Sequence, residues 1–341
     1  MDYEHDTAPG YREDPRVALG EALSEMKRVI VGQDAMLERL MVALLAGGHV
    51  LLEGVPGLAK TLTVKTLAEV LGGSFKRIQF TPDLVPADLV GTRIYRPNTG
   101  QFDVELGPVF GNFLLADEIN RAPAKVQSAL LEVMQEQQVT IGGTTYEVPR
   151  PFLVLATQNP IEAEGTYPLP EAQVDRFLMK ILVDYPTRGE EAAVVGRSLG
   201  EPAEVRELLS LEELARFSHA TRSVLVDREV IGYTVAIADA TRRPAAYGLD
   251  PLAPLIEWGA SPRGPIGLVQ AARALALLRG RGHVTLTDIR DLAADVLRHR
   301  LVLSYEALSA DVSADDVIDR VVSAVIGPRA EQMEHHMAVA G

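Results

Sequence analysis

A lysine and a threonine follow a turn of small residues near position 60, in a pattern suited to binding phosphate. The segment reads Gly54-Val55-Pro56-Gly57-Leu58-Ala59-Lys60-Thr61. It lies between the apolar run 49–53 and the helical pattern 61–71, which is the strand, loop and helix order of a phosphate-binding loop. Small residues let successive N–H groups point at an anion, and the helix N-terminus adds its positive end. Lys60 is therefore expected to reach nucleotide phosphates, and Thr61 to offer its hydroxyl to Mg²⁺.

This loop departs from the general GxxxxGK[ST] pattern at one position, because Ala59 stands where a second glycine is usual. Alanine is the smallest replacement and crowds the loop least. The competing interpretation is a strand-to-helix turn in which Lys60 occurs by chance. The flanking strand and helix, together with the acidic pair described next, favour the phosphate loop.

Two adjacent carboxylates, Asp117 and Glu118, end the apolar run 113–116. At the carboxyl end of a parallel strand they would project into a ligand crevice. Asp117 is then expected to hold Mg²⁺, directly or through water, and Glu118 to accept a proton from an attacking water. Such a pair is common at strand ends, so its meaning depends on the phosphate loop upstream.

Three further polar residues have two interpretations each. Asn159 ends the next apolar run, where it either orients the water or only forms a turn with the following proline. Arg176 either pairs with Asp175 or stabilises transition-state charge on the nucleotide of a neighbouring subunit. Arg263 lies in the first turn of a helix, where a cation opposes the helix dipole. It therefore either faces an anion such as the γ-phosphate or is a solvated surface arginine.

A parallel sheet is the element most suited to bring these residues together. Apolar runs that do not alternate, separated by helical patterns, indicate a sheet buried on both faces. The runs are 49–53, 75–80, 112–117, 151–157 and 177–183. Helical patterns occupy 18–45, 61–71 and 123–135.

Two segments interrupt this order and read as β-hairpins. In one, residues 93–95 and 101–106 flank a Pro-Asn-Thr-Gly turn. In the other, residues 139–141 and 144–148 flank Gly142-Gly143. A parallel sheet requires neither of them, so the pattern alone leaves them as surface additions.

After Pro186 the pattern is helical, with capping boxes that begin at Ser210, Thr285 and Ser313. The sequence therefore predicts four parts. These are a flexible leader (1–16), a nucleotide-binding α/β domain (17–186), a helical lid domain (187–333) and a tail (334–341).

Composition narrows the possible functions. The chain has 341 residues and no cysteine, which excludes thiol nucleophiles, disulfides and iron–sulfur clusters. With 33 basic and 47 acidic side chains, the net charge of −14 argues against a protein that coats nucleic acid. No targeting signal opens the chain, and the longest apolar stretch, 40–52, is too short and interrupted to span a bilayer. We expect a soluble cytoplasmic protein.

Together these residues resemble an AAA+ ATPase, and within that group the MoxR family. The resemblance covers about residues 17–330. It rests on Val31-Gly32-Gln33, GVPGLAKT at 54–61, LLADEINRAP at 114–123, QSALLEVMQE at 127–136, ATQNPIEAEGTYPLPEAQVDRF at 156–177 and SPRG at 261–264. Many MoxR-like loops also carry alanine at the position of Ala59.

The resemblance implies a P-loop AAA+ core and roles for single residues. The core would be a five-stranded, mostly parallel sheet flanked by helices, with two inserted β-hairpins and a C-terminal all-helical lid. Walker A would span Gly54 to Thr61, with Leu62 next to it, and Walker B would be Asp117 and Glu118. Sensor 1 would be Asn159, the arginine finger Arg176 and sensor 2 Arg263. Ile30, Val31 and Gln33 would lie near adenine.

The resemblance also implies an activity and partners. MoxR-like proteins bind ATP or ADP with Mg²⁺, form hexameric rings and act as chaperones that mature other complexes, often by inserting a metal or cofactor. They commonly act with von Willebrand factor A-domain proteins. We therefore expect an Mg²⁺-dependent ATPase that remodels a protein partner. Lys60 and Arg263 would contact phosphates in one protomer, or Arg263 would act on a neighbour's nucleotide.

Two other functions compete with this one. A motor that translocates nucleic acid needs a basic hairpin, yet residues 93–106 carry two arginines against Asp103 and Glu105. A nucleotide-gated scaffold would hydrolyse ATP negligibly, and the intact Asp117-Glu118 pair argues against it.

Overall fold

A parallel β-sheet forms the centre of the first half of the chain. The structure, a computed structural model, describes residues 14–55, 57–98, 100–159, 165–201 and 203–325. Within them the sheet has the strand order β2-β5-β8-β1-β9, and every neighbouring pair is parallel. The strands are β1 (Val50–Glu53), β2 (Phe75–Gln79), β5 (Phe113–Asp117), β8 (Leu153–Gln158) and β9 (Met179–Leu182).

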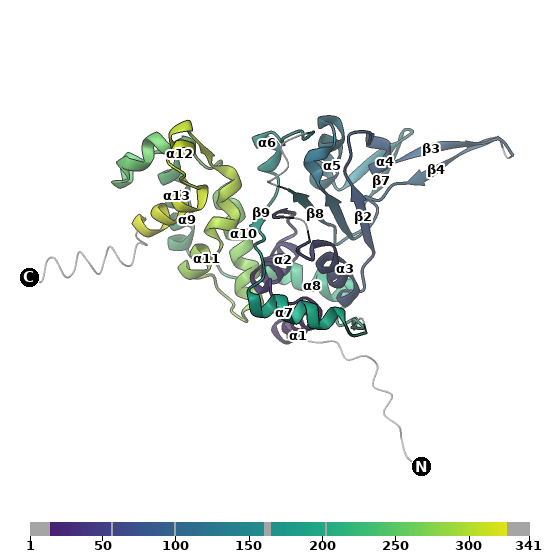
Figure 1. Cartoon of the computed structure of the whole chain (residues 1–341), viewed down its shortest axis with the longest axis horizontal. Coiled ribbons are helices and arrows are strands. Elements are labelled where there is room, and N and C mark those ends of the chain that lie inside the picture. The colour runs from purple at the N-terminus through teal and green to yellow at the C-terminus, as the bar shows by residue number, and fades with distance from the viewer. Residues whose placement is uncertain (1–13, 56, 99, 160–164, 202, 326–341) are drawn as a thin grey trace, which may run out of the picture.

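Both faces of this sheet are covered, which explains why its strands do not alternate between apolar and polar residues. Val50 and Leu52 pack into one hydrophobic cluster, whereas Leu51 between them packs into another. The first cluster includes side chains of α1 (Pro15–Val29), α2 (Asp34–Ala46) and α3 (Lys60–Val70). The second includes α4 (Pro86–Val90) and α5 (Ala124–Glu136), on the other face (Figure 1).

The helical pattern predicted over 18–45 is two helices in the structure, so that prediction was wrong between them. Gly32 and Gln33 both have positive φ, of 67° and 59°, which ends the helical path between α1 and α2. The positive φ of Gly32 favours glycine, because L side chains rarely adopt this conformation.

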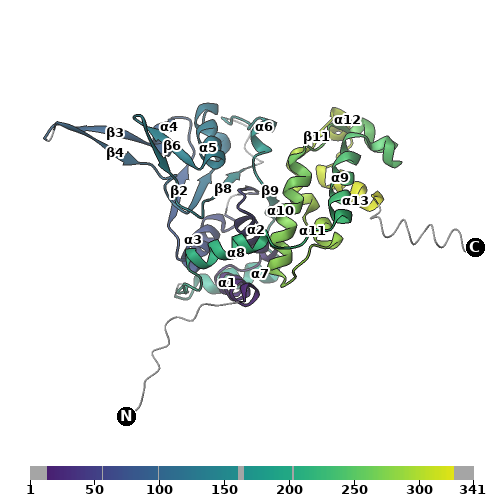
Figure 2. The ribbon, with the colours of Figure 1, turned by 180° about the vertical axis from the view of Figure 1, so that it is seen from behind.

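Both predicted hairpins are present. β3 (Gly91–Arg96) pairs with β4 (Gln101–Leu106), and β6 (Gln138–Ile141) pairs with β7 (Thr144–Glu147). The β3–β4 hairpin projects from the side of the sheet that is farther from the C-terminal helices (Figures 1 and 2).

The rest of the chain is mainly helical, as predicted, and the capping boxes at Ser210, Thr285 and Ser313 are all present. Its helices are α7 (Arg188–Ser198), α8 (Leu211–Thr221), α9 (Arg228–Arg242), α10 (Arg263–Leu278), α11 (Leu286–Leu297), α12 (Tyr305–Ser309) and α13 (Ala314–Ala324). A short antiparallel pair, β10 (Ile256–Trp258) and β11 (Val302–Leu303), also forms there, which the sequence pattern did not indicate.

Short elements complete the chain and connect these parts. They are α6 (Glu171–Val174) and the 3₁₀ helices η1 (Ile119–Arg121), η2 (Pro244–Tyr247), η3 (Asp250–Leu255) and η4 (Arg298–Arg300). α8 and α10 pack against α2, and Ser218 on α8 donates a hydrogen bond of 2.9 Å to the Leu45 carbonyl. One hydrophobic core therefore runs from the sheet into the C-terminal helices. No helix among the described residues is long and apolar enough to cross a membrane.

Candidate functional site

The loop between β1 and α3 has the conformation that its small residues suggested. Gly57 and Ala59 take positive φ, of 86° and 54°, and Lys60 begins α3. A Cβ on Gly54 would lie 2.5 Å from the Val183 carbonyl oxygen, so the start of the loop also requires glycine. Alanine costs more than glycine in the left-handed region, so the loop holds Ala59 under strain of about 1 kcal/mol. The predicted site residue Pro56 lies outside the described residues.

Lys60 is held at the mouth of this loop, where its ammonium group donates a hydrogen bond to the Gly54 carbonyl. Burial lowers the pKa of Lys60, while the negative charges of Asp117 and Glu118 act in the opposite direction. Lys60 is thus a partly buried cation near two carboxylates. A phosphate bound in this loop would replace its present contact with the Gly54 carbonyl. Thr61 is half-buried beside it, and the exposed Leu62 follows.

Asp117 and Glu118 lie across a shared pocket from Lys60. The pocket has a volume of about 470 Å³ and is bordered by Gly54, Gly57, Leu58, Ala59, Lys60, Thr61, Leu62, Arg77, Gln79, Asp117, Glu118, Gln158 and Asn159. Most of the residues predicted for the phosphate loop, the acidic pair and Asn159 therefore meet in one place. Parallel strands bring their carboxyl ends to the same edge of the sheet, which is why segments so distant in sequence converge.

The acidic pair is tied to β8 through one threonine. Thr157 donates its hydroxyl to Asp117 Oδ1 at 2.6 Å and accepts the Glu118 N–H at 2.8 Å. Glu118 itself has a positive φ of 55°, so the chain turns sharply just where β5 ends. Asn159, two residues after Thr157, is buried with 8% of its surface exposed.

Two side chains of the edge strand β2 belong to the same site, and sequence reasoning missed both. Arg77 forms an ion pair with Asp117 at 2.6 Å, and Gln79 donates to Glu118 Oε2 at 2.7 Å. Arg121 also reaches Glu118 Oε2, at 2.9 Å. Gln79 lies opposite Asp117 in the parallel β2–β5 pair, a register that no local sequence pattern marks.

The donors in this pocket fit a magnesium ion bound together with a phosphate. Thr61 and Asp117 offer the hard oxygen ligands that Mg²⁺ prefers, and Mg²⁺ usually takes only one or two protein ligands beside substrate phosphates and water. In the part of the chain that the structure describes, no cluster of three or more acidic or histidine side chains forms a self-sufficient metal cage.

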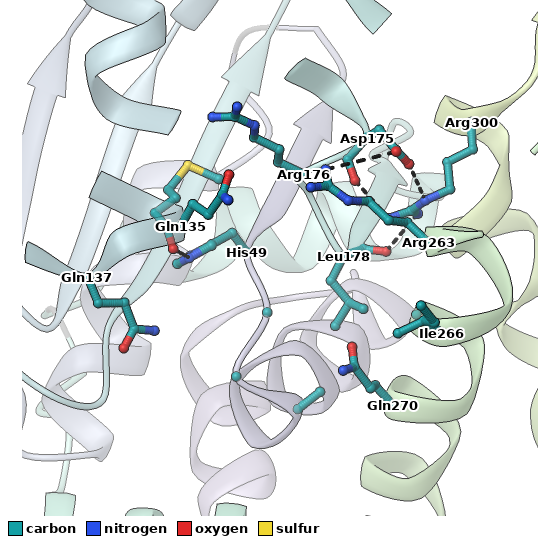
Figure 3. Close-up of a pocket in the computed structure, with 15 residues that line it drawn as sticks. His49, Gln135, Gln137, Asp175, Arg176, Leu178, Arg263, Ile266, Gln270 and Arg300 are labelled. Carbon is teal, nitrogen blue, oxygen red and sulfur yellow. Dashed lines mark hydrogen bonds and ion pairs between the residues drawn. The ribbon is translucent and has the colours of Figure 1, made fainter. Parts of the chain in front are cut away.

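Arg176 and Arg263 do not lie in this pocket but together border a second one (Figure 3). The second pocket, also about 470 Å³, includes residues 46–49, which precede β1, whereas the phosphate loop follows β1. The two pockets therefore lie at opposite ends of that strand. Contact of Lys60 and Arg263 with one nucleotide in one protomer, as first expected, would need the helical region to move.

The two arginines differ in how they are held. The Arg176 side chain is exposed and forms no hydrogen bond or ion pair with the residues that the structure describes, so the expected alternative of a bridge to Asp175 is not seen. Asp175 instead pairs with Arg300 at 2.9 Å and with Arg263 at 3.9 Å. Arg263 remains about half-exposed, with 47% of its side chain accessible.

His49 borders the second pocket, and two hydrogen bonds hold its ring in place. Its ring accepts the Val154 N–H at Nδ1 and donates from Nε2 to the Met134 carbonyl, both at 3.1 Å. This pairing requires the neutral ring with its proton on Nε2. Burial lowers the pKa of His49 to about 4.

The segment expected near adenine forms the break between α1 and α2. Ile30 is buried, and Gln33 donates to the Asp184 carbonyl at 2.9 Å. Ile30, Val31 and Gln33 are not among the residues that border the Lys60 pocket. Their role toward a base stays a prediction.

Comparison with known proteins gives two family models and close relatives along nearly the whole chain. Residues 49–179 match the model "ATPase family associated with various cellular activities (AAA)", and residues 252–334 match "AAA lid domain". Chaperone MoxR1 of Mycobacterium tuberculosis is 54% identical, over 95% of this chain and 87% of that protein. Protein MoxR of Methylorubrum extorquens is 33% identical, over 92% of this chain and 96% of its own.

A solved structure agrees with the fold. The crystal structure of a protein from Cytophaga hutchinsonii superposes with a TM-score of 0.87 at 48% sequence identity, over 92% of this chain and 96% of the other. The sheet, the two hairpins and the C-terminal helical region are thus found in the arrangement expected of a AAA core with its lid.

Proposed function

Because the chain belongs to the MoxR family of AAA+ ATPases, we propose that it hydrolyses ATP with Mg²⁺ and couples the hydrolysis to remodelling of a protein client. The observation that carries this proposal is the convergence of Lys60, Thr61, Asp117 and Glu118 on one pocket. A cation for the phosphates, ligands for a metal and a base for water are the parts that phosphoryl transfer to water needs.

Five side chains of the pocket and the N–H groups of its loop take part in the proposed reaction. Lys60 and the N–H groups of the phosphate loop bind the β- and γ-phosphates. Thr61 and Asp117 hold Mg²⁺, which supplies positive charge against the charge that develops on the phosphoryl oxygens. Glu118 takes a proton from the attacking water, and Asn159 orients that water.

Glu118 contacts Gln79 and Arg121 through only one of its two oxygens. Gln79 and Arg121 both contact the same oxygen, Oε2, so a water that approached this oxygen would compete with them. The other oxygen, Oε1, forms no hydrogen bond or ion pair with the residues that the structure describes, so it can accept a proton from water in the pocket.

The second pocket supports a site shared between subunits. Arg176 is exposed and unpaired among the described residues, and it lies at the opposite end of β1 from the phosphate loop. In a ring of copies packed head to tail, one end of the sheet faces the other end of the next copy. We therefore assign Arg176 as an arginine finger toward the neighbour's γ-phosphate, with Arg263 acting beside it in trans. A hexamer, as the family resemblance implies, is part of this proposal.

The client part of the proposal depends on relatives rather than on the site. One relative is named a chaperone, and the chain matches it along most of its length. A von Willebrand factor A-domain protein is the partner that the family resemblance suggests, and a cytoplasmic location belongs to the same proposal. The net charge of −14 gives no support to a nucleic-acid motor.

The proposed hydrolysis is tested by Glu118→Gln. This change keeps the shape of the side chain and removes the base, so nucleotide binding should persist while turnover falls about 100-fold or more. A fluorescent ATP analogue measures binding, and released inorganic phosphate measures turnover. Unchanged turnover would remove Glu118 from the mechanism. Negligible turnover in the unmodified protein would favour a nucleotide-gated scaffold, and a strong stimulation by DNA would favour a motor.

A further inference from the structure

Asp175, which precedes the proposed arginine finger Arg176, contacts side chains from separate parts of the lid. Its Oδ1 accepts hydrogen bonds from Arg300 Nε at 2.9 Å and from the Ser261 hydroxyl at 3.1 Å. Its Oδ2 accepts the same hydroxyl at 2.9 Å and lies 3.9 Å from Arg263 Nη1. Ser261 in turn accepts the Arg263 N–H at 3.1 Å, at the beginning of α10. One carboxylate thus connects the segment before β9 with two separate parts of the lid (Figure 3).

Arg300 fastens the same segment from the other side. Besides Asp175, its guanidinium donates to the carbonyls of Phe177 at 2.7 Å and Leu178 at 3.2 Å. Only 8% of the Arg300 surface is exposed, and burial lowers the pKa of Arg300 to about 10. A cation this enclosed depends on its counter-charge, because an unpaired buried charge is strongly unfavourable.

The charge balance of this pocket shows why Asp175 matters to its neighbours. Three arginines border the pocket, Arg176, Arg263 and Arg300, and Asp175 is the one acid among the described residues around it. Asp175 forms a close ion pair with the buried Arg300 and a longer one, at 3.9 Å, with Arg263. The Arg176 side chain points away from Asp175 (Figure 3). Arg176 is attached to the backbone that Arg300 grips, and Arg263 to the helix that Ser261 begins.

We propose that Asp175 is a positioning residue that holds the lid against residues 175–178, the finger segment, so that Arg176 and Arg263 are presented to a neighbouring subunit as one preset pair. This inference rests on the proposed function, since it assumes that both arginines act in trans. Asp175 touches no substrate. It acts by keeping the start of α10 and the segment before β9 in a fixed relation, and a small misplacement of catalytic groups is costly to turnover.

Asp175→Asn tests this in the full-length protein. The amide keeps an acceptor oxygen for Ser261 and Arg300 but removes the negative charge that pairs with Arg300 and Arg263. Turnover should fall about 100-fold. The KM for ATP and the affinity for a fluorescent ATP analogue should stay as in the unmodified protein, because the protomer's own phosphate loop is intact. Asp175→Glu, which restores the charge, should recover part of the turnover.

Mixing variants distinguishes positioning from general damage. Lys60→Ala subunits cannot bind nucleotide well but present normal arginines, so adding them to Asp175→Asn subunits should restore activity. Adding Arg176→Ala subunits should restore none, because both variants impair the same side of the shared site. Asp315→Asn is the matched control. It removes a carboxylate that pairs at 2.8 Å with Arg298, which lies in η4 as Arg300 does. This change does not touch the finger segment. It should lower thermal stability and leave turnover near normal.

Two outcomes would overturn the inference. One is normal turnover in Asp175→Asn, and the other is a loss of turnover that Lys60→Ala subunits do not restore. If the proposed shared site itself is wrong, the mixing experiments give a different result. If Arg176→Ala and Lys60→Ala subunits do not restore each other, the shared site itself is wrong. If they do while Asp175→Asn behaves otherwise than expected, only the role of Asp175 falls.

Discussion

At the scale of single residues, the two carboxylates at the end of β5 are each held by a side chain of the same edge strand. Arg77 neutralises Asp117, and Gln79 binds Glu118. Since Asp117 is the proposed metal ligand, Mg²⁺ and Arg77 would compete for one carboxylate. The ion pair also keeps Asp117 from repelling a phosphate when no metal is present.

This competition predicts the behaviour of Arg77→Ala. Without the guanidinium, Asp117 should attract Mg²⁺ more strongly, so the Mg²⁺ concentration at which nucleotide binding is half-complete should fall. In EDTA, the affinity for ATP should fall as well, because Asp117 then faces the phosphates without a cation. Titrations of a fluorescent ATP analogue with and without Mg²⁺ measure both effects. The same change in Asp117→Asn protein should have little effect, and a full effect there would show that Arg77 acts elsewhere.

Sequence was a good guide to some of these residues and a poor guide to others, for a physical reason. Lys60, Thr61, Asp117 and Glu118 belong to short continuous motifs whose chemistry is local. Arg77 and Gln79 act only because β2 pairs with β5 in one particular register, and a single sequence does not specify that register. The close relation of Asp175 to Arg300 joins residues 125 positions apart and was equally hidden.

At the scale of elements, the strand β1 connects the two pockets through its two ends. The phosphate loop follows β1. His49 precedes β1 and borders the second pocket, which is called the arginine pocket here because Arg176, Arg263 and Arg300 also border it. His49 ties β1 to β8 and to the end of α5 through hydrogen bonds that only its neutral ring makes. The order of the elements could be predicted, because apolar runs and capping boxes mark them. The break at Gly32 and the β10–β11 pair could not, because tertiary contacts rather than local pattern produce them.

The buried ring makes stability depend on pH. The pKa of His49 is about 4 in the folded protein against 6.5 for an ordinary histidine, so the unfolded chain takes up a proton first as the pH falls. The stability that the neutral ring provides is therefore complete above about pH 6.5 and is lost progressively toward pH 4. Between pH 7.5 and 5.5 this amounts to about 1 kcal/mol of unfolding free energy.

His49→Gln should be less stable at pH 7.5, because it loses one of the two hydrogen bonds. Between pH 7.5 and 5.5, the unfolding free energy of this variant should fall by about 1 kcal/mol less than that of the unmodified protein. Urea unfolding at both pH values gives the comparison. Burial also lowers the pKa of His299, which is partly buried, so some pH dependence should remain in the variant. An unchanged pH dependence would mean that His49 does not titrate as its environment indicates.

At the scale of the whole molecule, the lid is joined firmly to the sheet. Arg298 donates to the Lys180 carbonyl of β9 at 2.6 Å, and Arg300 grips the segment just before that strand. The arginine pocket thus belongs to a well-connected junction, while the phosphate pocket opens at the other end of the sheet. If hydrolysis moves this protein, the arrangement favours movement of one subunit against the next. In the proposed ring, a client would then respond to movement between subunits rather than within one subunit.

Mixing of variant subunits tests whether one active site is built from residues of two subunits, as we propose. Arg176→Ala should reduce turnover about 1,000-fold, since it removes the charge that stabilises the transition state. Lys60→Ala should be inactive because it does not bind nucleotide. Mixing the two and measuring phosphate release should restore a clear fraction of activity, because some interfaces then combine an intact phosphate loop with an intact arginine. No activity above the sum of the separate variants, in rings shown to contain both, would contradict the account.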